Sequence, residues 1–353
     1  MQKDTNTRSI CFDDILLVPK KSNIVTRGEI KLNTVIGNPF RPEAFIYLNS
    51  PIILAPMAFI TSNAMIEKVV SSGGLAILPR YANFEERIIR LKTILSNVDS
   101  KFVGFALSIE ESKNKDYLQV LKNLGVRVLL LEVALGHLKI VVDAVKDLRS
   151  LVDDNVHIMT GNVSSYEAYK DLMDAGADSV RVGIGGGAAC TTRVVTGFGV
   201  PVLASVMDVY DNIKDSEVSG LISDGGVKNN GDVAKALAAG ASAVMMGSFF
   251  AGHDECDRDQ NGKHVLRGSA SMEIQVHNNP DIVKNLKNVY VEGVSGIVSE
   301  RGPVENSINM LLNNIKSALS YSGSENLLSF RQNSTYIEVS SMSNLESGDR
   351  VVK

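Results

Sequence analysis

Cysteine is scarce in this sequence. Its three cysteines, Cys11, Cys190 and Cys256, cannot all pair, and none forms a Cys-x-x-Cys motif with another. The spacing therefore indicates neither a disulfide framework nor a standard zinc site. Because free thiols suit a reducing compartment, we expect a cytoplasmic protein.

The sequence also lacks long apolar runs and long basic runs. Its first residues are polar, without the apolar stretch of a secretory signal, and no later apolar segment is long enough to cross a bilayer. The net charge of −4 is small, and lysine and arginine form no long run. Neither a nucleic acid nor a membrane is therefore indicated as a partner, and a small molecule is the expected ligand.

What the sequence does contain is the composition and pattern of a globular α/β protein. Hydrophobic residues make up 44% of the 353 positions and glycine occurs 29 times, which indicates a large core with many tight turns. Eight short apolar runs alternate with helical patterns, as parallel strands buried on both faces do. These runs lie at residues 52–54, 75–78, 102–106, 126–131, 157–160, 179–182, 221–223 and 243–246. Helical patterns at 165–175 and 231–239 end at glycines, which are typical C-terminal caps.

Eight such runs predict a (β/α)8 TIM barrel of the α/β class, which ordinarily uses ~250 residues as one unit. We expect a single catalytic barrel over residues 1–330, with an active-site flap at about 251–300 inserted after the last strand. The polar stretch at residues 253–259 predicts an exposed hairpin or flap, and residues 302–320 resume a helical pattern. Residues 331–353 form the expected polar C-terminal tail.

Glycine-rich and polar segments follow the last four predicted strands. They are Gly161-Asn162, the loop with Cys190, Asp224-Gly225-Gly226, and Gly247-Ser248. The carboxyl ends of the strands are where barrel active sites are built. This clustering predicts a functional site at that end of the barrel.

The loop at residues 183–193 carries the strongest candidate nucleophile. Its successive glycines free the backbone to turn amides or carbonyls toward a ligand or ion. Cys190 ends the glycine-rich part and is followed by Thr191, Thr192 and Arg193. Nearby positive charge favours a thiolate, which is the reactive form. A packed thiol beside a flexible loop is the alternative that glycines alone would favour, but the position after the sixth strand favours the nucleophile.

The segments after the seventh and eighth strands are candidates for holding a nucleotide. Backbone amides freed by the glycines at 225, 226 and 247 can bind phosphate oxygens, and Asp224 suits the paired hydroxyls of a ribose. The alternative is that Asp-Gly-Gly simply forms a tight turn. Taken alone, the motif leaves both interpretations open.

Motifs that carry a family resemblance extend over nearly the whole chain. They are residues 12–19 (FDDILLVP), 55–57 (APM), 161–163 (GNV), the Cys190 loop, 223–226 (SDGG), 231–241 (GDVAKALAAGA), 246–248 (MGS), 251–253 (AGH), 292–293 (EG) and 302–306 (GPVEN). Together they resemble the inosine-monophosphate dehydrogenase and GMP reductase family. The pair of small regulatory CBS domains that many of its dehydrogenases insert after the second strand is absent, because Pro79 leads directly into a helical pattern.

The resemblance implies roles for the matching positions. Cys190 would attack C2 of a purine, with Thr192 and Glu292 assisting proton transfer. Substrate binding is implied for Met57, Arg193, Asp224, Gly225, Gly226, Gly247 and Ser248. Binding of NADPH or NAD is implied for Glu132, Asn162 and Gly183, and carbonyls of Gly185, Gly187 and Cys190 would hold a monovalent cation, K+. Similar proteins are homotetramers.

The two activities of the family share a purine thioimidate on the cysteine and differ afterwards. The dehydrogenase hydrolyses it with an Arg-Tyr pair on its flap. The nearest match here is Lys287 to Tyr290, and lysine is ordinarily too strongly protonated to act as the base. The reductase needs no water activation, since it expels ammonia from GMP and then accepts hydride at C2.

The remaining motifs divide between the two activities. His253 and the runs at residues 204–207 and 302–306 resemble the reductase, while residues 292–296 (EGVSG) resemble the dehydrogenase. We therefore predict an NADPH-dependent GMP reductase acting on GMP or a related guanine nucleotide and forming IMP. The alternatives are an NAD-dependent IMP dehydrogenase forming XMP and a non-catalytic regulator that binds purine nucleotides.

Several ligand positions depart from the family pattern. Gly186 and Ala188 replace proline and serine, Leu266 replaces tyrosine, Ala58 and Glu132 each replace aspartate, and Pro79-Arg80 replaces a pair such as His-Lys. Each lost hydrogen bond costs about 0.5–1.5 kcal/mol, so two lost phosphate donors weaken binding on the order of tenfold to a hundredfold. Either Arg80 compensates, or the substrate is a modified purine, a deoxynucleotide or a purine without the usual phosphate. The charge of Glu132 also disfavours an extra phosphate on the cofactor.

The other two cysteines are expected to be unreactive. Cys11 stands beside Phe12 and is predicted to be packed. Cys256 lies in a charged stretch and is predicted to be a surface thiol.

Overall fold

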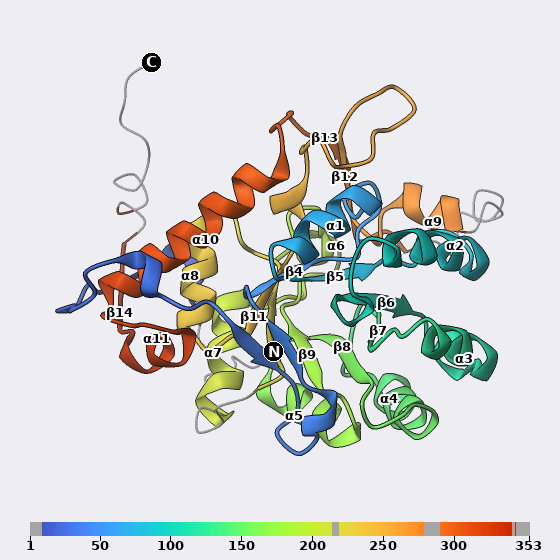
Figure 1. The fold of residues 1–353 in the computed structure, drawn as a ribbon, viewed down its shortest axis with the longest axis horizontal. Helices are drawn as coiled ribbons and strands as arrows, with labels where there is room; N and C mark the ends of the chain where they lie inside the picture. Colours follow the sequence, from blue (N-terminus) through green and yellow to red (C-terminus); the bar gives the residue numbers. More distant parts are fainter. Residues whose placement is uncertain (1–8, 214–218, 279–289, 341–342, 344–353) are drawn as a thin grey trace.

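Eight parallel strands close into a barrel in the order β10-β11-β4-β5-β6-β7-β8-β9 (Figure 1). The structure is a computed structural model, which describes residues 9–213, 219–278, 290–340 and 343. The barrel strands are β4 (Ile52–Leu54), β5 (Leu75–Leu78), β6 (Val103–Leu107), β7 (Val128–Leu131), β8 (His157–Val163), β9 (Ser179–Val182), β10 (Leu221–Asp224) and β11 (Ala243–Met246). The predicted α/β barrel is confirmed, and each predicted apolar run overlaps one of these strands.

The strands are apolar throughout because both of their faces are buried. In β7, Leu129 and Leu131 pack into the cluster between barrel and helices, while Val128 and Leu130 pack into a second cluster that fills the interior. An antiparallel hairpin of β2 (Thr34–Ile36) and β3 (Ile46–Leu48) adds apolar side chains to the interior cluster. The barrel interior is therefore filled with side chains, and a binding site has to lie at the end of the barrel away from this hairpin.

Helices surround the barrel (Figure 1). They are α1 (Asn63–Ser71), α2 (Phe84–Leu95), α3 (Lys115–Asn123), α4 (Lys139–Leu151), α5 (Tyr166–Ala175), α7 (Val202–Ile213) and α8 (Asn230–Ala238). The Ser165 hydroxyl caps α5 by accepting from the Ala168 amide, and Gly176 ends the helix with a φ of 116°. Residues 79–83 join β5 directly to α2, so no further domain is inserted there.

A flap follows the barrel. It contains β12 (Val265–Arg267) paired antiparallel with β13 (Ser295–Ile297), and α9 (Met272–Asn278). The predicted exposure of residues 253–259 is wrong at its start, because His253 and Cys256 are buried. The His253 ring contacts the Phe250 carbonyl and the Ser307 hydroxyl, so the segment remains attached to the body.

The chain then returns to the barrel through α10 (Val304–Tyr321) and α11 (Leu327–Asn333). Part of the expected polar tail packs against the body, since Arg331 donates to the Ala241 carbonyl at 3.1 Å. Strand β14 (Tyr336–Glu338) pairs antiparallel with β1 (Ile15–Leu17), which brings the two ends of the described chain together. Residues 341–342 and 344–353 lie outside the described part. None of the described helices is both long and apolar enough to cross a membrane.

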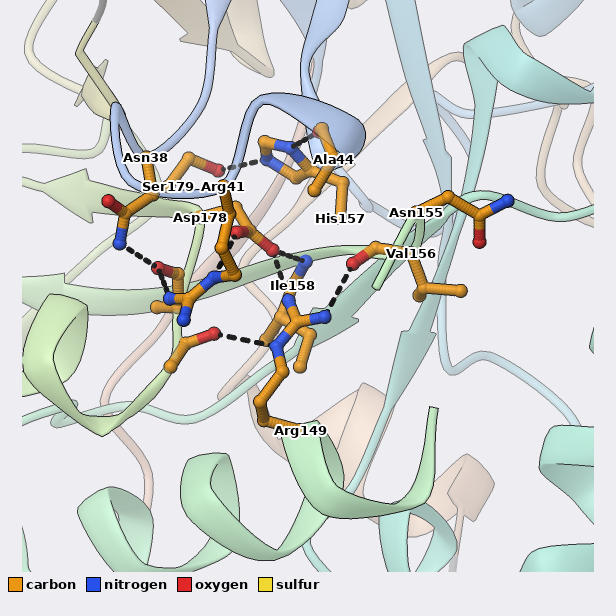
Figure 2. A network of polar contacts seen from close by, with 12 residues as sticks. Asn38, Arg41, Ala44, Arg149, Asn155, Val156, His157, Ile158, Asp178 and Ser179 are labelled. Carbon is orange, nitrogen blue, oxygen red and sulfur yellow. Dashed lines mark hydrogen bonds and ion pairs between the residues drawn. The ribbon is translucent and has the colours of Figure 1, made fainter. Parts of the chain in front are cut away.

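A buried aspartate holds the amino ends of β8 and β9 together (Figure 2). Asp178 is fully buried and accepts from Arg41 at 3.0 Å, from Arg149, and from the Ile158 amide at 2.8 Å. Two guanidinium groups and an amide therefore satisfy a charge that would be costly to bury alone.

A buried histidine lies beside this aspartate (Figure 2). The ring of His157 is within 2.9 Å of the Ala44 carbonyl and 2.7 Å of the Ser179 hydroxyl. Burial is the largest influence on its pKa and lowers it, so the ring favours the neutral form. This network stabilises the end of the barrel away from the site.

Candidate active site

A cavity of about 360 Å³ opens at the carboxyl ends of the strands. The segments after six barrel strands line it, together with Asn162 of β8 and the flap. All but one of the predicted site residues contribute to the lining. They are Met57, Glu132, Asn162, Gly183, Gly185, Gly187, Cys190, Thr192, Asp224, Gly225, Gly226, Gly247, Ser248 and Glu292.

Three of these residues form a chain of hydrogen bonds. The exposed thiol of Cys190 lies 3.2 Å from the Thr192 hydroxyl, which donates to a carboxylate oxygen of Glu292 at 2.7 Å. Glu292 comes from the flap, so the chain joins residues a hundred positions apart. The arrangement provides a nucleophile with a hydroxyl and a carboxylate able to carry a proton beside it.

Backbone hydrogen bonds fix the cysteine loop against the flap. The Thr191 amide donates to the Glu292 carbonyl at 3.0 Å, and the Val294 amide donates to the Ala189 carbonyl at 2.9 Å. Cys190 and Gly293 also form an isolated antiparallel bridge. The flap segment therefore sets the position of both the thiol and the carboxylate.

The three cysteines differ strongly in environment. Cys190 is exposed to the cavity, whereas Cys256 is buried and was wrongly expected at the surface. Burial raises the pKa of Cys256 to about 11, and its thiol donates to the Phe250 carbonyl. Burial and Asp14 raise the pKa of Cys11. At neutral pH, both of these thiols should therefore be poor nucleophiles.

Asp224 lines the cavity and lies close to the side chains of Asn162 and Arg181. Asn162 donates one amide hydrogen to the Asp224 carboxylate at 2.8 Å and another to the Gly183 carbonyl at 3.0 Å. Arg181 lies 3.6 Å from the same carboxylate oxygen. Burial raises the pKa of Asp224, while the charge of Arg181 and the amide of Asn162 oppose that shift.

Arg181 also lines the cavity, although no sequence motif indicated it. Its guanidinium is buried and lines the cavity, and its Nε has no hydrogen-bond partner among the described residues. A signal was present in the sequence, because an arginine interrupts the apolar run 179–182. A charged residue inside a buried strand is rarely placed there without a partner.

A second ion pair lines the cavity beside the loop after β7. Arg80 donates to a carboxylate oxygen of Glu132 at 3.1 Å. The side chain of Glu132 is 14% exposed and that of Arg80 is 39% exposed. The predicted cofactor residue Glu132 therefore has a neutralising partner. That partner, Arg80, is the residue considered as one replacement for the lost phosphate donors, and it is bound to Glu132 here.

Close approaches of backbone shape the corner formed by β10 and β11. Gly225 and Gly226 have φ values of 83° and 77°, which favour glycine. A Cβ at Gly247 would lie 2.2 Å from the sulfur of Met57, so a larger residue there would have to displace the Met57 side chain. Ala188 and Leu266 line the cavity without a side-chain donor.

Arg193 is the predicted site residue that does not line the cavity. Its guanidinium donates to the Val200 carbonyl at 2.8 Å. Its stem packs over Gly185 and Gly199, where a Cβ would lie 2.8 Å and 2.7 Å from it. In this structure the side chain holds the ends of its own loop together, and the binding of substrate by Arg193 stays a prediction.

The residues expected to hold a cation contribute carbonyl oxygens. The Gly187 carbonyl accepts from the Cys190 amide at 3.0 Å, and a carbonyl oxygen has a second lone pair. Backbone carbonyls are the ligands that potassium takes in proteins. The donor set at Gly185, Gly187 and Cys190 therefore has the chemistry that a monovalent cation needs. The residues expected to hold the cofactor line the same cavity. Gly183 packs closely against the end of β10, since a Cβ there would lie 2.2 Å from the Asp224 carbonyl oxygen.

Known proteins are similar in sequence to this chain. It is 39% identical over 226 residues to an inosine-5'-monophosphate dehydrogenase of Rhizobium tropici, covering 61% of this chain and 45% of that protein. It is 35% identical over 259 residues to a GMP reductase of Leishmania donovani, covering 70% and 52%. The chain thus spans about half the length of these two curated relatives.

The fold also matches a solved structure. A GMP reductase from Trypanosoma brucei in complex with guanosine 5'-monophosphate superposes with a TM-score of 0.83 at 21% identity, covering 98% of each chain. The family model of the IMP dehydrogenase / GMP reductase domain matches residues 9–349 of the sequence. Since that match takes in nearly the whole chain, this protein belongs to the IMP dehydrogenase and GMP reductase family of oxidoreductases.

Proposed function

We propose that this protein reductively deaminates GMP, or a related guanine nucleotide, to IMP with NADPH. The observation that carries the proposal is the hydrogen-bonded chain from Cys190 through Thr192 to Glu292 inside the cavity. It combines a nucleophile for C2 of the purine with a route for the proton that the leaving amino group needs.

Each of the three hydrogen-bonded residues has its own step in the proposed reaction. The Cys190 thiol passes its proton through Thr192 to the Glu292 carboxylate, and the resulting thiolate adds to C2. The same proton returns from Glu292 through Thr192 to the amino group, and ammonia leaves a thioimidate joined to sulfur. NADPH, when bound, supplies the hydride that reduces C2. The C2–S bond then breaks and its electron pair returns to sulfur, so one GMP, one NADPH and one proton give IMP, ammonia and NADP+.

The rest of the cavity would hold the two ligands. Asp224 would bind the ribose hydroxyls, and the backbone at Gly225, Gly226, Gly247 and Ser248 would receive the phosphate, with Met57 against the substrate. Glu132, Asn162 and Gly183 also line the cavity and would hold the cofactor. The carbonyls of Gly185, Gly187 and Cys190 would hold a potassium ion near the nucleophile.

The proposal is tested by incubating the pure protein with GMP and NADPH in potassium buffer. We expect the cofactor absorbance to fall and ammonia to appear in equal amounts. Deoxy-GMP and guanosine, run in parallel, report on the phosphate and the ribose. Binding of these purines without any turnover would instead favour a regulator and would refute the proposal.

An IMP dehydrogenase is the second candidate. It is favoured by the segment 292–296 and by the identity to the Rhizobium dehydrogenase. Of the pair nearest to its water-activating residues, Tyr290 is 81% exposed, and Lys287 lies outside the described residues. Reduction of NAD in the presence of IMP, with XMP as product, would favour this candidate over the first.

A further inference from the structure

A short turn near the start of the chain lies behind the cavity. The 3-10 helix η1 (Phe12–Asp14) leads into β1. The Asp14 carboxylate accepts from the Cys11 amide at 2.7 Å, and the Asp14 carbonyl accepts from the Val339 amide at 2.8 Å. The turn is thus closed on itself and held by the chain that follows β14.

The ring of Phe12 packs against the backbone of the loop after β10. Phe12 is 5% exposed, and a Cβ placed on Gly226 would lie 3.4 Å from its ring and 3.2 Å from Val202. Val202 also packs on the loop after β9, since a Cβ on Gly186 would lie 2.3 Å from it. Phe12 and Val202 therefore form an apolar support behind two loops that line the cavity.

Polar contacts attach the same turn to the carboxyl end of this loop and to α8, the helix that follows it. Lys235, on the helix that follows the loop, donates to the Phe12 carbonyl at 2.7 Å. Lys228 pairs with Asp13 at 2.5 Å. Since both partners of that ion pair are exposed, it contributes little, and the half-buried bond from Lys235 is the stronger restraint.

We infer that Phe12 is a positioning residue that holds Gly225 and Gly226 in the conformation that binds substrate. The two glycines have positive φ values and no side chains of their own, so their conformation depends on what packs behind them. Phe12 does not line the cavity, so any effect it has on the substrate passes through the loop. The inference rests on the proposed function only for the claim that this loop holds the nucleotide.

The test compares Phe12→Ala with Phe12→Leu, with Lys235→Met, and with Phe84→Ala as a control. Phe84 is 6% exposed and lies on α2, whose residues do not line the cavity. Hydrogen exchange is measured on the peptide covering residues 223–229. We expect Phe12→Ala and Lys235→Met to exchange about fivefold faster there or more, Phe12→Leu to restore slow exchange, and Phe84→Ala to leave this peptide unchanged.

Kinetics with GMP and NADPH provide the second measurement. Phe12→Ala should raise the KM for GMP about three- to tenfold with a smaller change in kcat, since the nucleophile is supported elsewhere. Unchanged exchange at 223–229 in Phe12→Ala, or an equal change in the control, would overturn the positioning role. Wild-type protein inert toward GMP would refute the proposed function instead, and the exchange result would still decide the role of Phe12.

Discussion

The proton route through the flap makes a quantitative prediction for Glu292→Gln. The Thr192 hydroxyl donates to Glu292 at 2.7 Å, and a hydrogen bond to a charged acceptor contributes about 1.5–3 kcal/mol. Glutamine has nearly the same shape as glutamate and its carbonyl can still accept the hydrogen bond from Thr192, but it cannot return a proton to Thr192. Because general acid catalysis contributes about 10²- to 10⁴-fold, we expect turnover of GMP to fall by about a hundredfold or more.

The assay separates this loss from damage to the site. Ammonia release and NADPH consumption are followed in steady state, and the Kd for GMP is measured by calorimetry. The Kd of Glu292→Gln for GMP should be within about threefold of the wild-type value, because the lost proton transfer matters mainly when the amino group leaves. Thr192→Val should lose activity to a similar extent and Thr192→Ser should retain most of it. Turnover within threefold of wild type in Glu292→Gln would refute the proton route.

Three further predictions concern buried polar groups. In Asn162→Leu, Asp224 loses its 2.8 Å hydrogen bond and its pKa rises further, so the carboxylate takes up a proton at a higher pH than in wild type. GMP binding, measured from pH 5 to 8, should therefore begin to weaken at a higher pH as the pH is lowered. An unshifted pH profile would count against this prediction. Burial lowers the pKa of His157 below its usual 6.5, so below about pH 6.5 the unfolded chain binds a proton that the folded chain does not, and the free energy of unfolding should fall with the pH. Urea titrations at pH 7.5 and 5.5 should show a smaller fall between the two pH values in His157→Gln than in wild type. Equal falls in the two proteins would contradict this prediction. Arg149→Met removes one of the two guanidinium groups on buried Asp178 and should cost about 3–5 kcal/mol of unfolding free energy in the same titrations, whereas a loss under 1 kcal/mol would show that Arg41 alone suffices.

The barrel was predictable because its strands are buried on both faces. The runs at residues 52–54, 75–78, 179–182 and 243–246 coincide with β4, β5, β9 and β11, and the other four overlap their strands. A strand with no solvent face reads as a short continuous apolar run, and glycine marks where the next element begins. The position of the site followed from the same pattern, since the polar residues after these strands meet at one end of the barrel.

Contacts made by single side chains and by backbone could not be predicted in this way. Cys256 is buried although its neighbours Asp254 and Asp257 are exposed, because one small residue turns inward beneath the Phe250 carbonyl. Nor did any motif indicate that the Arg193 guanidinium would donate to the Val200 carbonyl. Such outcomes depend on local turns rather than on a repeating pattern.

The pairing of the chain ends was also invisible in the sequence. Strands β1 and β14 are three residues each, and every residue of β14 is exposed. Their pairing is carried by backbone hydrogen bonds, which any residue except proline can make. No alternation of apolar and polar residues therefore marks the ribbon that holds the turn behind the cavity.

The central claim is that Cys190 forms a covalent bond to a purine at C2, and mass spectrometry tests it directly. The protein is exposed to GMP, IMP and guanosine without the second substrate, quenched in acid and digested. The account predicts a purine adduct on the peptide with Cys190, none on the peptides with Cys11 or Cys256, and none in Cys190→Ala. Turnover of any of these purines by Cys190→Ala at the wild-type rate, or an adduct on another cysteine, would contradict it.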